Sequence, residues 1–240
     1  MINEADLGSE ERWLYELISR KALESLRKNN FDAEYASDRK EALEKVIQRI
    51  PSKATIGVGD SVTLQQIGFF SWLESRKDYQ VFNPFLKNPE GYSIAAPQER
   101  FELMRKALTS DVFLAGTNAV TLDGKLVNID ARGNRTAAMI FGPKKVILVV
   151  GVNKIVRDVD EAFRRIKEVC APINAKRHFE KHHIESMGEL PCVKTGVCVN
   201  CNSPSKICRK IVIIDGQSPR FRFEEEEGIS IIIVGEKLGI

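Results

Sequence analysis

Residues 111–150, "DVFLAGTNAVTLDGKLVNIDARGNRTAAMIFGPKKVILVV", carry the clearest pattern of buried strands in the chain. It opens with an apolar run at 111–115 and closes with another at 145–150, and both are typical of strands buried on both faces of a parallel sheet. Between them, the Asp-Gly dipeptide at 123–124 predicts a tight hairpin turn, and residues 136–141 predict a short helix. Two buried strands separated by a hairpin and a helix indicate an α/β fold.

The alternation of strands and helices continues on both sides of this stretch. Strands that alternate with helices of about a dozen residues predict a Rossmann-like, mostly parallel sheet with helices on both faces. We expect residues 1–50 to be an N-terminal helical segment packed on the main domain, 51–240, with the Cys-rich segment 176–210 as a long C-terminal excursion from the sheet. Further strands are predicted at 32–36, 54–58, 80–82, 211–215 and 229–234, and helices at 9–29, 38–50, 63–74, 97–108 and 159–170, the last ending near Pro172.

The composition excludes several classes of protein. The 240 residues include 36 basic and 33 acidic side chains, and this even balance argues against an extended nucleic-acid surface. No apolar run reaches the roughly 18 residues that a membrane helix needs, and the acidic N-terminus lacks the features of a secretory signal. We therefore expect a cytoplasmic protein with no nucleic-acid or membrane partner, in a compartment where thiols stay reduced.

Four of the 5 cysteines lie within "CVKTGVCVNCNSPSKIC", residues 192–208. In a reducing compartment, four clustered thiolates suit tetrahedral zinc or an iron–sulfur cluster, and nearby Lys and Arg side chains offset the negative charge of either site. The alternative is a set of free thiols that line a pocket. The histidines just upstream either replace one cysteine or form a solvated helix end. The residues concerned are Cys192, Cys198, Cys201 and Cys208, with His178, His182 and His183 as the histidines.

A second candidate is "TIGVGDSVTLQQIG", residues 55–68, which predicts a strand, a glycine-containing turn and the start of a helix. Such a turn presents unpaired backbone N–H groups at the positive end of a helix, where a phosphate or carboxylate binds well. The alternative is a capped turn without a ligand. The candidate ligand-binding residues here are Gly57, Gly59, Asp60, Ser61 and Thr63.

A third candidate is the polar sequence that follows the strand at 111–115. Clustered amides, carboxylates and guanidiniums are costly to order unless they bind a ligand or one another, so we expect a ligand site at these strand ends. In it, Arg135 would hold an anion and Asp130 would act as a general base; the alternative is that Asp130 pairs with Arg132 or Arg135 and caps the next helix. The other candidate ligand-binding residues are Gly116, Thr117, Asn118, Asn128, Gly133 and Asn134.

Four motifs make the chain resemble the LUD-domain family of lactate utilization proteins. They are GVGDSVTLQQIG at 57–68, GTNAVTLDGKLVNIDARGNRTAAMIFGPKKVILVVGVNKIV at 116–156, APINAKR at 171–177 and CVKTGVCVNCNSPSKICR at 192–209. The resemblance implies a fold like that of ribose-phosphate isomerases, glucosamine-phosphate deaminases and CoA transferases. It also implies a connection with lactate oxidation, in which partner subunits carry iron–sulfur clusters.

Three hypotheses of function follow. In the first, the protein is a redox-associated subunit or enzyme of small-carboxylate metabolism, with an anion pocket, a Cys-ligated metal and iron–sulfur or oxidoreductase partner subunits. In the second, it is an isomerase or transferase that acts on a sugar phosphate or a CoA-linked metabolite and uses the metal structurally. In the third, it is a non-catalytic ligand-sensing or assembly subunit. Each involves a small anionic metabolite, and a homodimer is compatible with all three.

Overall fold

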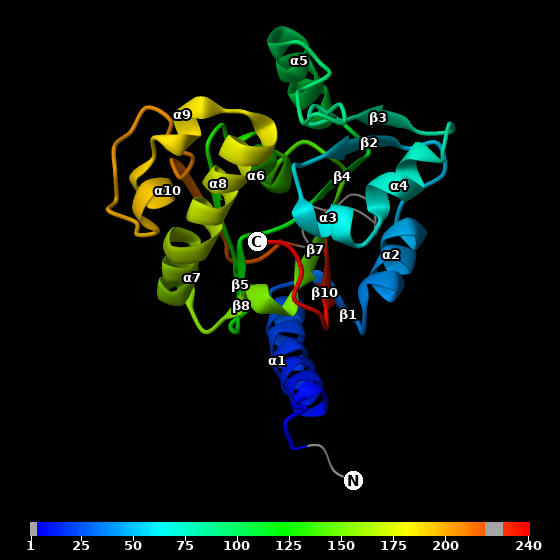
Figure 1. Ribbon diagram of the computed structural model, residues 1–240. Coiled ribbons are helices and arrows are strands. Elements are labelled where there is room, and N and C mark those ends of the chain that lie inside the picture. Colours follow the sequence, from blue (N-terminus) through cyan, green and yellow to red (C-terminus); the bar gives the residue numbers. More distant parts are fainter. Residues whose placement is uncertain (1–3, 219–227) are drawn as a thin grey trace.

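The computed structural model describes residues 4–218 and 228–240, and it confirms the Rossmann-like α/β fold (Figure 1). Its centre is a six-stranded sheet in the order β1-β10-β7-β4-β2-β3, in which every pair of neighbours is parallel. The strands are β1 Asp32–Ala36, β2 Thr55–Val58, β3 Gln80–Phe82, β4 Val112–Ala115, β7 Lys145–Gly151 and β10 Gly228–Val234.

Both faces of this sheet are buried, because alternate residues of each central strand enter two different cores. In β7, Leu148 packs in one core and Ile147 in the other, and neither is exposed to solvent. The first core is covered by α1 Gly8–Lys28, α5 Pro97–Ala107 and α6 Asn134–Ile140. The second is covered by α2 Arg39–Gln48, α3 Val62–Gln66 and α4 Phe69–Glu74.

The expected hairpin is present and belongs to a second, four-stranded sheet in the order β8-β5-β6-β9. Its turn docks on α1, where the side-chain amide of Asn29 donates to the carbonyl oxygens of Asp123 and Gly124. Gly124 has a φ of 85°, and a Cβ there would lie 2.6 Å from the carbonyl carbon of Ser25, so only glycine fits. The strands are β5 Ala119–Thr121, β6 Leu126–Asp130, β8 Ile155–Val156 and β9 Lys210–Ile214.

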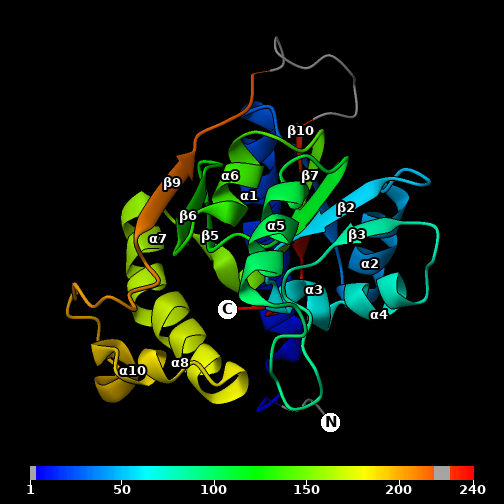
Figure 2. The same cartoon turned by 90° about the horizontal axis from the view of Figure 1, so that it is seen from above.

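A long helical rod covers the second sheet (Figure 2). The prediction that the helix from 159 ends near Pro172 is wrong: α7 Val159–Arg165 continues through a π-helical turn, Ile166–Cys170, into α8 Ala171–His182. Pro172 is the second residue of α8 and follows directly on this π-helical turn, in which the regular hydrogen-bond pattern of an α-helix is already altered. Arg165 fixes the start of the rod by donating to the carbonyl oxygens of Asn153 and Asn118 at 3.0 and 2.9 Å.

The helix expected at 63–74 is also different, because it is divided into α3 and α4. Gly68 lies between them with a φ of 80°, a left-handed conformation that ends one helix and lets the chain begin the next at a new angle. Helix α3 is therefore only five residues long.

The N-terminal segment contains the predicted strand at 32–36, and the Cys-rich segment is more helical than the sequence indicates. Segment 1–50 supplies the edge strand β1, which pairs with β10, in addition to α1 and α2. Segment 176–210 contains the end of α8 and two short helices, α9 Glu185–Gly188 and α10 Pro191–Thr195, before an irregular stretch that leads into β9. In the described parts of the chain, no helix combines the length and apolar character that crossing a membrane requires.

Candidate functional site

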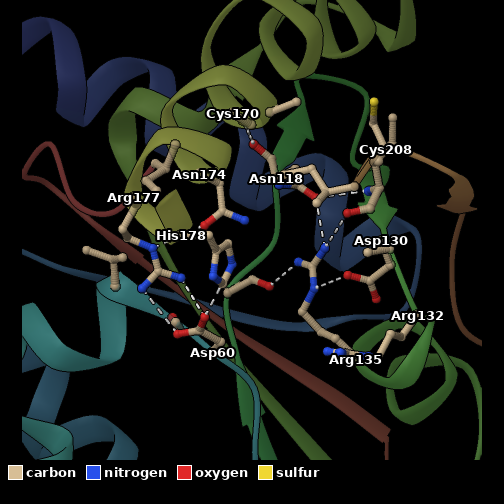
Figure 3. Close-up of a pocket in the computed structure, with 18 of the residues that line it drawn as sticks. Asp60, Asn118, Asp130, Arg132, Arg135, Cys170, Asn174, Arg177, His178 and Cys208 are labelled. Atoms are coloured by element: carbon tan, nitrogen blue, oxygen red, sulfur yellow. Dashed lines mark hydrogen bonds and ion pairs between the residues drawn. The ribbon is translucent and has the colours of Figure 1, made fainter. Parts of the chain in front are cut away.

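A cleft of about 470 Å³ lies between the carboxyl edge of the parallel sheet and helix α8 (Figure 3). The segment after β2 and the segment after β4 form one wall, while α8 and the Cys-rich loop form the other. Strands β2 and β4 are neighbours, so the chain turns that follow them meet at this edge. Ligands of open α/β sheets bind at the same place, which makes this cleft the candidate site.

The structure brings together most, but not all, of the residues expected to bind a ligand. Gly57 lies outside the cleft, where a Cβ would meet Ser110 Oγ at 2.8 Å, so this glycine serves the packing of α5 on β2. Gly133 has a φ of 94° and allows Lys210 of β9 to pass close by. Residues that do line the cleft are Asp60, Ser61, Thr63, Gly116, Thr117, Asn118, Asp130, Asn134 and Arg135; Gly57, Gly59, Asn128 and Gly133 do not.

The turn at 57–63 matches the capped alternative rather than the anion site. Ser61 Oγ accepts a hydrogen bond from the backbone N–H of Leu64 at 3.3 Å and caps α3. Because α3 has only five residues and Asp60 precedes it, its amino end is a poor place for an anion. The expected role of Gly57 and Gly59, close approach of a ligand to the backbone, is therefore corrected to helix and strand packing.

Arg135 donates every one of its five N–H groups to the protein. Its Nη1 bonds Gly116 O at 2.8 Å and Asn128 Oδ1 at 2.9 Å, and its Nη2 bonds Asn118 Oδ1 at 2.9 Å and Ile129 O at 3.1 Å. Its Nε bonds a carboxylate oxygen of Asp130 at 3.3 Å. A guanidinium has five donors, so none is left for a carboxylate ligand. The expectation that Arg135 holds the anion is corrected: it positions the hairpin against the end of β4.

Asp130 is engaged in the same network. Besides Arg135, it accepts a hydrogen bond from the backbone N–H of Thr136 at 2.9 Å and so caps α6, as the alternative interpretation expected. With both oxygens occupied, Asp130 is not placed as a general base. Asn128 is fully buried, and its Oδ1 also accepts from the Thr117 hydroxyl at 3.1 Å.

Helix α8 contributes a group that the sequence analysis did not assign. Arg177 bonds both carboxylate oxygens of Asp60, with Nη1 3.3 Å from Oδ1. His178 Nδ1 lies 2.8 Å from His182 Nδ1, and His178 Nε2 lies 3.9 Å from Asp60 Oδ2. The alternative that the histidines form a solvated helix end is wrong for His178 and His182, which are half-buried in the cleft. It holds for His183, which is exposed. The available signal was the i, i+4 spacing of the histidines, which places both on one helix face.

The cleft carries an excess of positive charge. Its two side-chain carboxylates, Asp60 and Asp130, are each paired with an arginine. Burial, followed by repulsion from Arg100, lowers the pKa of Lys87. Within the described residues, six further basic side chains line the cleft and lie beyond 4 Å from any carboxylate: Lys87, Arg100, Arg132, Lys154, Lys206 and Arg209.

Lys154 lies at the floor of the cleft, and the sequence analysis missed it. It ends a short 3-10 turn, Val152–Lys154, just after β7, and its Nζ donates to Thr63 Oγ1 at 3.0 Å. Burial, with a smaller contribution from Arg165, lowers its pKa from 10.5 to about 7. A substantial fraction of the Lys154 side chains is therefore neutral at physiological pH. The signal in the sequence was a lone lysine directly after a fully apolar strand.

The four clustered cysteines are free thiols on one side of the cleft, and Cys208 lines it. Burial, followed by the proximity of Cys201, Cys198 and Cys208, raises the pKa of the Cys192 thiol. The four side chains thus lie near one another. However, within residues 4–218 and 228–240 no three of the four sulfur atoms all lie within 4.8 Å of one another.

Comparison with known proteins identifies the family. A family model described as the LUD domain matches residues 19–223, which is most of the chain. This chain belongs to the LUD-domain family. The resemblance seen in the sequence motifs is thereby confirmed, and the chain is a protein of the lactate-utilization type.

A solved structure supports the fold of this LUD-domain protein. It is a DUF162 family protein from Deinococcus radiodurans, with 14% sequence identity, coverage of 92% of this chain and 98% of that chain, and a TM-score of 0.50. At this identity the likeness concerns the fold alone. No curated protein matches the chain.

Replacing Arg135 by lysine should lower the free energy of unfolding by about 3 kcal/mol, because an ammonium cannot reach the acceptors that five N–H groups now satisfy. Urea unfolding measures the difference. The matched control is Arg132→Lys, whose guanidinium lies over the ring of Phe101 5.5 Å from its centroid, and we expect a change within about 0.5 kcal/mol there. Equal effects of the two substitutions would contradict the positioning role.

Replacing Lys154 by methionine should remove part of the pH dependence of stability. Between its native pKa of about 7 and its ordinary value of 10.5, unfolding takes up a proton at Lys154, so the wild type gains stability as the pH rises. The stability difference between wild type and Lys154→Met should therefore change by up to about 1.4 kcal/mol per pH unit above pH 7 and stay constant below it. Urea unfolding of both proteins from pH 6 to 9 tests this, and parallel curves would refute it.

Proposed function

We propose that this LUD-domain protein binds a small anionic metabolite in the cleft and works in small-carboxylate metabolism, as an enzyme or a redox-associated subunit. The observation that carries the proposal is the unbalanced positive charge at the carboxyl edge of the sheet. In the part of the chain that the structure describes, six basic side chains line the cleft with no side-chain carboxylate within 4 Å, while Asp60 and Asp130 are already paired with arginines. An incoming anion would relieve the repulsion among these cations.

Lys87 and Arg100 support this proposal most directly. Burial lowers the pKa of each, and each is further lowered by a neighbouring cation, Arg100 for Lys87 and Arg132 for Arg100. A lowered pKa means that the charged form is destabilised in the empty cleft. A bound carboxylate would reverse this, and Arg100 could hold it through the N–H groups that remain after its Nε donates to Pro84 O.

Lys154 would supply proton transfer. Its pKa of about 7 lets it exchange a proton with a bound hydroxy or keto acid near neutral pH. Arg135 would not touch the ligand, but it fixes the backbone of Gly116 and the side chain of Asn118, which face the ligand from the end of β4. The roles first expected for Asp130 and Arg135 thus pass to Lys154 and Arg100.

A second candidate function is isomerisation or group transfer on a sugar phosphate or a CoA-linked metabolite. The observation in its favour is the number of cations. Lys87, Arg100 and Arg132 together exceed what one carboxylate needs, and a phosphate dianion would use them better.

We also propose that Cys192, Cys198, Cys201 and Cys208 hold zinc or an iron–sulfur cluster. The donor set fits, since four thiols lie near one another; burial, followed by the other three cysteines, raises the pKa of the Cys192 thiol, which a bound cation would lower. Their sulfur atoms would have to move closer to bind one ion. An iron–sulfur cluster would supply electron transfer beside the cleft, and zinc would order the loop.

A thermal-shift screen of hydroxy acids, keto acids, sugar phosphates and CoA esters tests the anion site and separates the two functions. A ligand present at 100 times its Kd adds about 2.7 kcal/mol of stability, which corresponds to a rise in Tm of several degrees. We expect Lys87→Gln and Arg100→Gln each to weaken the best ligand by about tenfold. Lys21→Gln, an exposed residue of α1, is the control for net charge and should bind normally.

Two results would contradict the anion site. One is a screen in which no anion stabilises the wild type. The other is a ligand whose affinity is the same for Lys87→Gln, Arg100→Gln and Lys21→Gln. Preference for phosphorylated compounds over carboxylates would favour the second function.

Elemental and sulfide analysis of protein purified without oxygen tests the Cys-rich site. We expect either one zinc per chain or iron with acid-labile sulfide, and loss of that metal in Cys192→Ser/Cys201→Ser. Cys170→Ala is the matched control, because Cys170 is the fifth cysteine, buried in the π-helical turn where Arg165 contacts it. Unchanged metal content in the double variant would refute the site.

A further inference from the structure

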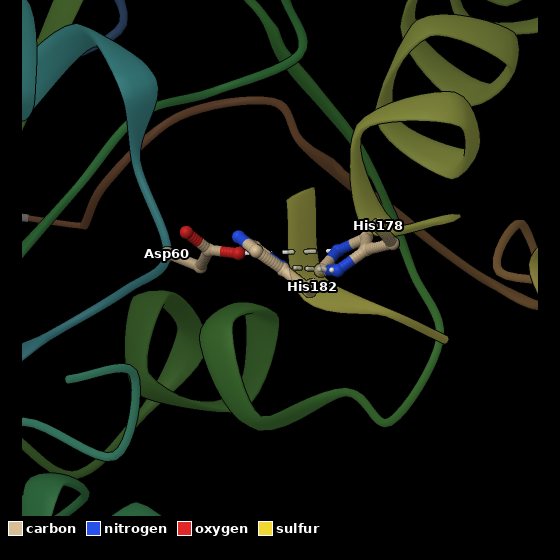
Figure 4. A group of neighbouring side chains, drawn as sticks. All are labelled: Asp60, His178 and His182. Carbon is tan, nitrogen blue, oxygen red and sulfur yellow. Dashed lines mark hydrogen bonds and ion pairs between the residues drawn. The ribbon is translucent and has the colours of Figure 1, made fainter. Parts of the chain in front are cut away.

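Asp60, His178 and His182 form a compact group at the wall of the cleft (Figure 4). One ligand atom from each side chain lies within 4.8 Å of the ligand atoms of the other two. Among residues 4–218 and 228–240, no other group of three His, Cys, Asp or Glu side chains is this compact. The carboxylate comes from the turn after β2, and the two imidazoles come from one face of α8, four residues apart. The group therefore joins the two walls of the cleft.

The three side chains are in the chemical state that metal binding needs. A metal binds a neutral imidazole and an ionised carboxylate. Burial lowers the pKa of both His178 and His182 to about 4, so both rings are neutral at pH 7. Burial opposes ionisation of Asp60, but Arg177 outweighs it and its pKa is lowered, so the carboxylate stays charged.

We propose that Asp60, His178 and His182 bind a first-row divalent transition metal ion, such as Zn²⁺ or Fe²⁺, whose remaining coordination positions face the cleft. Two histidines and one carboxylate are the ligand set of open catalytic sites for these metals, because three protein ligands leave room for water or substrate. Four-residue spacing on a helix is also what allows two histidines to bind one ion. The proposal is independent of which anion the cleft takes.

The distances require only a small adjustment. With metal–ligand bonds of about 2.1 Å, two ligands of a tetrahedral site are roughly 3.4 Å apart. His178 Nε2 and Asp60 Oδ2 are 3.9 Å apart, so they would approach by about half an ångström. One imidazole binds an ion through one nitrogen only, so coordination by His178 Nε2 beside Asp60 requires His182 to give up the 2.8 Å hydrogen bond between the two Nδ1 atoms and turn toward the ion. One ligand atom of each side chain already lies within 4.8 Å of the other two, so no pair would approach by more than about 1.4 Å.

Arg177 and the other cations set the strength of this site. Arg177 uses one lone pair on each oxygen of Asp60, which leaves a second lone pair on Oδ2 for the ion. A ligating carboxylate is commonly held by such an outer hydrogen bond. Lys87 and Arg100 repel a dication, so we expect this site to bind more weakly than a four-thiolate zinc site.

Cobalt titration of the full-length protein tests the proposal. Thiolate-ligated Co²⁺ shows intense charge-transfer absorption, whereas Co²⁺ bound by nitrogen and oxygen does not. The absorption spectrum therefore reports how much Co²⁺ is bound at the Cys-rich site, separately from the histidine site. We expect equilibrium dialysis to show one Co²⁺ per chain that persists in Cys192→Ser/Cys201→Ser and is lost, or weakened at least tenfold, in His182→Ala and Asp60→Asn. His183→Asn is the matched control and should keep this ion, because His183 bonds Glu90 O and stacks on Tyr92 instead.

Proton NMR of the wild type keeps the test decisive if Asp60→Asn does not fold. Co²⁺ should shift and broaden the ring resonances of His178 and His182 and leave those of His183 in place. Equal Co²⁺ stoichiometry in wild type and His182→Ala, or unshifted His178 and His182 resonances at saturating Co²⁺, would overturn the proposal and leave a proton-sharing histidine pair.

Discussion

The arrangement of the cleft depends on satisfying the guanidinium of Arg135. A buried donor left without an acceptor costs about 1–3 kcal/mol, and more when it is charged, so five such donors form a strong constraint. Their acceptors come from three places: Gly116 after β4, Asn118 just before β5, and the strand β6. A shift of any of these segments out of reach would leave a charged donor unpaired. Arg135 therefore ties the hairpin and strand β6 to the end of β4.

The sequence predicts the parallel sheet well, because buried strands such as 145–150 are continuous apolar runs that need no knowledge of their neighbours. It predicts helix ends less well. The break at Gly68 depends on a local left-handed conformation, and the continuation through Pro172 depends on a π-helical turn that packs against the second sheet. Both outcomes are decided by tertiary contacts that a periodic pattern does not contain.

The same contrast between local pattern and tertiary contact applies to the candidate site residues. Polar residues after strands 54–58 and 111–115 could be placed near the site, because the carboxyl ends of parallel strands share an edge. Their individual roles could not be assigned, since whether Arg135 faces a ligand or the protein depends on acceptors up to 19 positions away. The pairing of Asp60 with Arg177 spans 117 positions, and the sequence offers no signal for it beyond the histidine spacing beside it.

The helical rod from 159 to 182 has a consequence for the geometry of the opening. One end is fixed by Arg165 to two backbone carbonyl groups, and the other by Arg177 to a carboxylate, roughly 18 Å further along the helix. The ion pair of Arg177 is itself largely buried, and dissolved salt screens buried pairs much less than exposed ones. This wall of the cleft should therefore keep its position as the ionic strength changes.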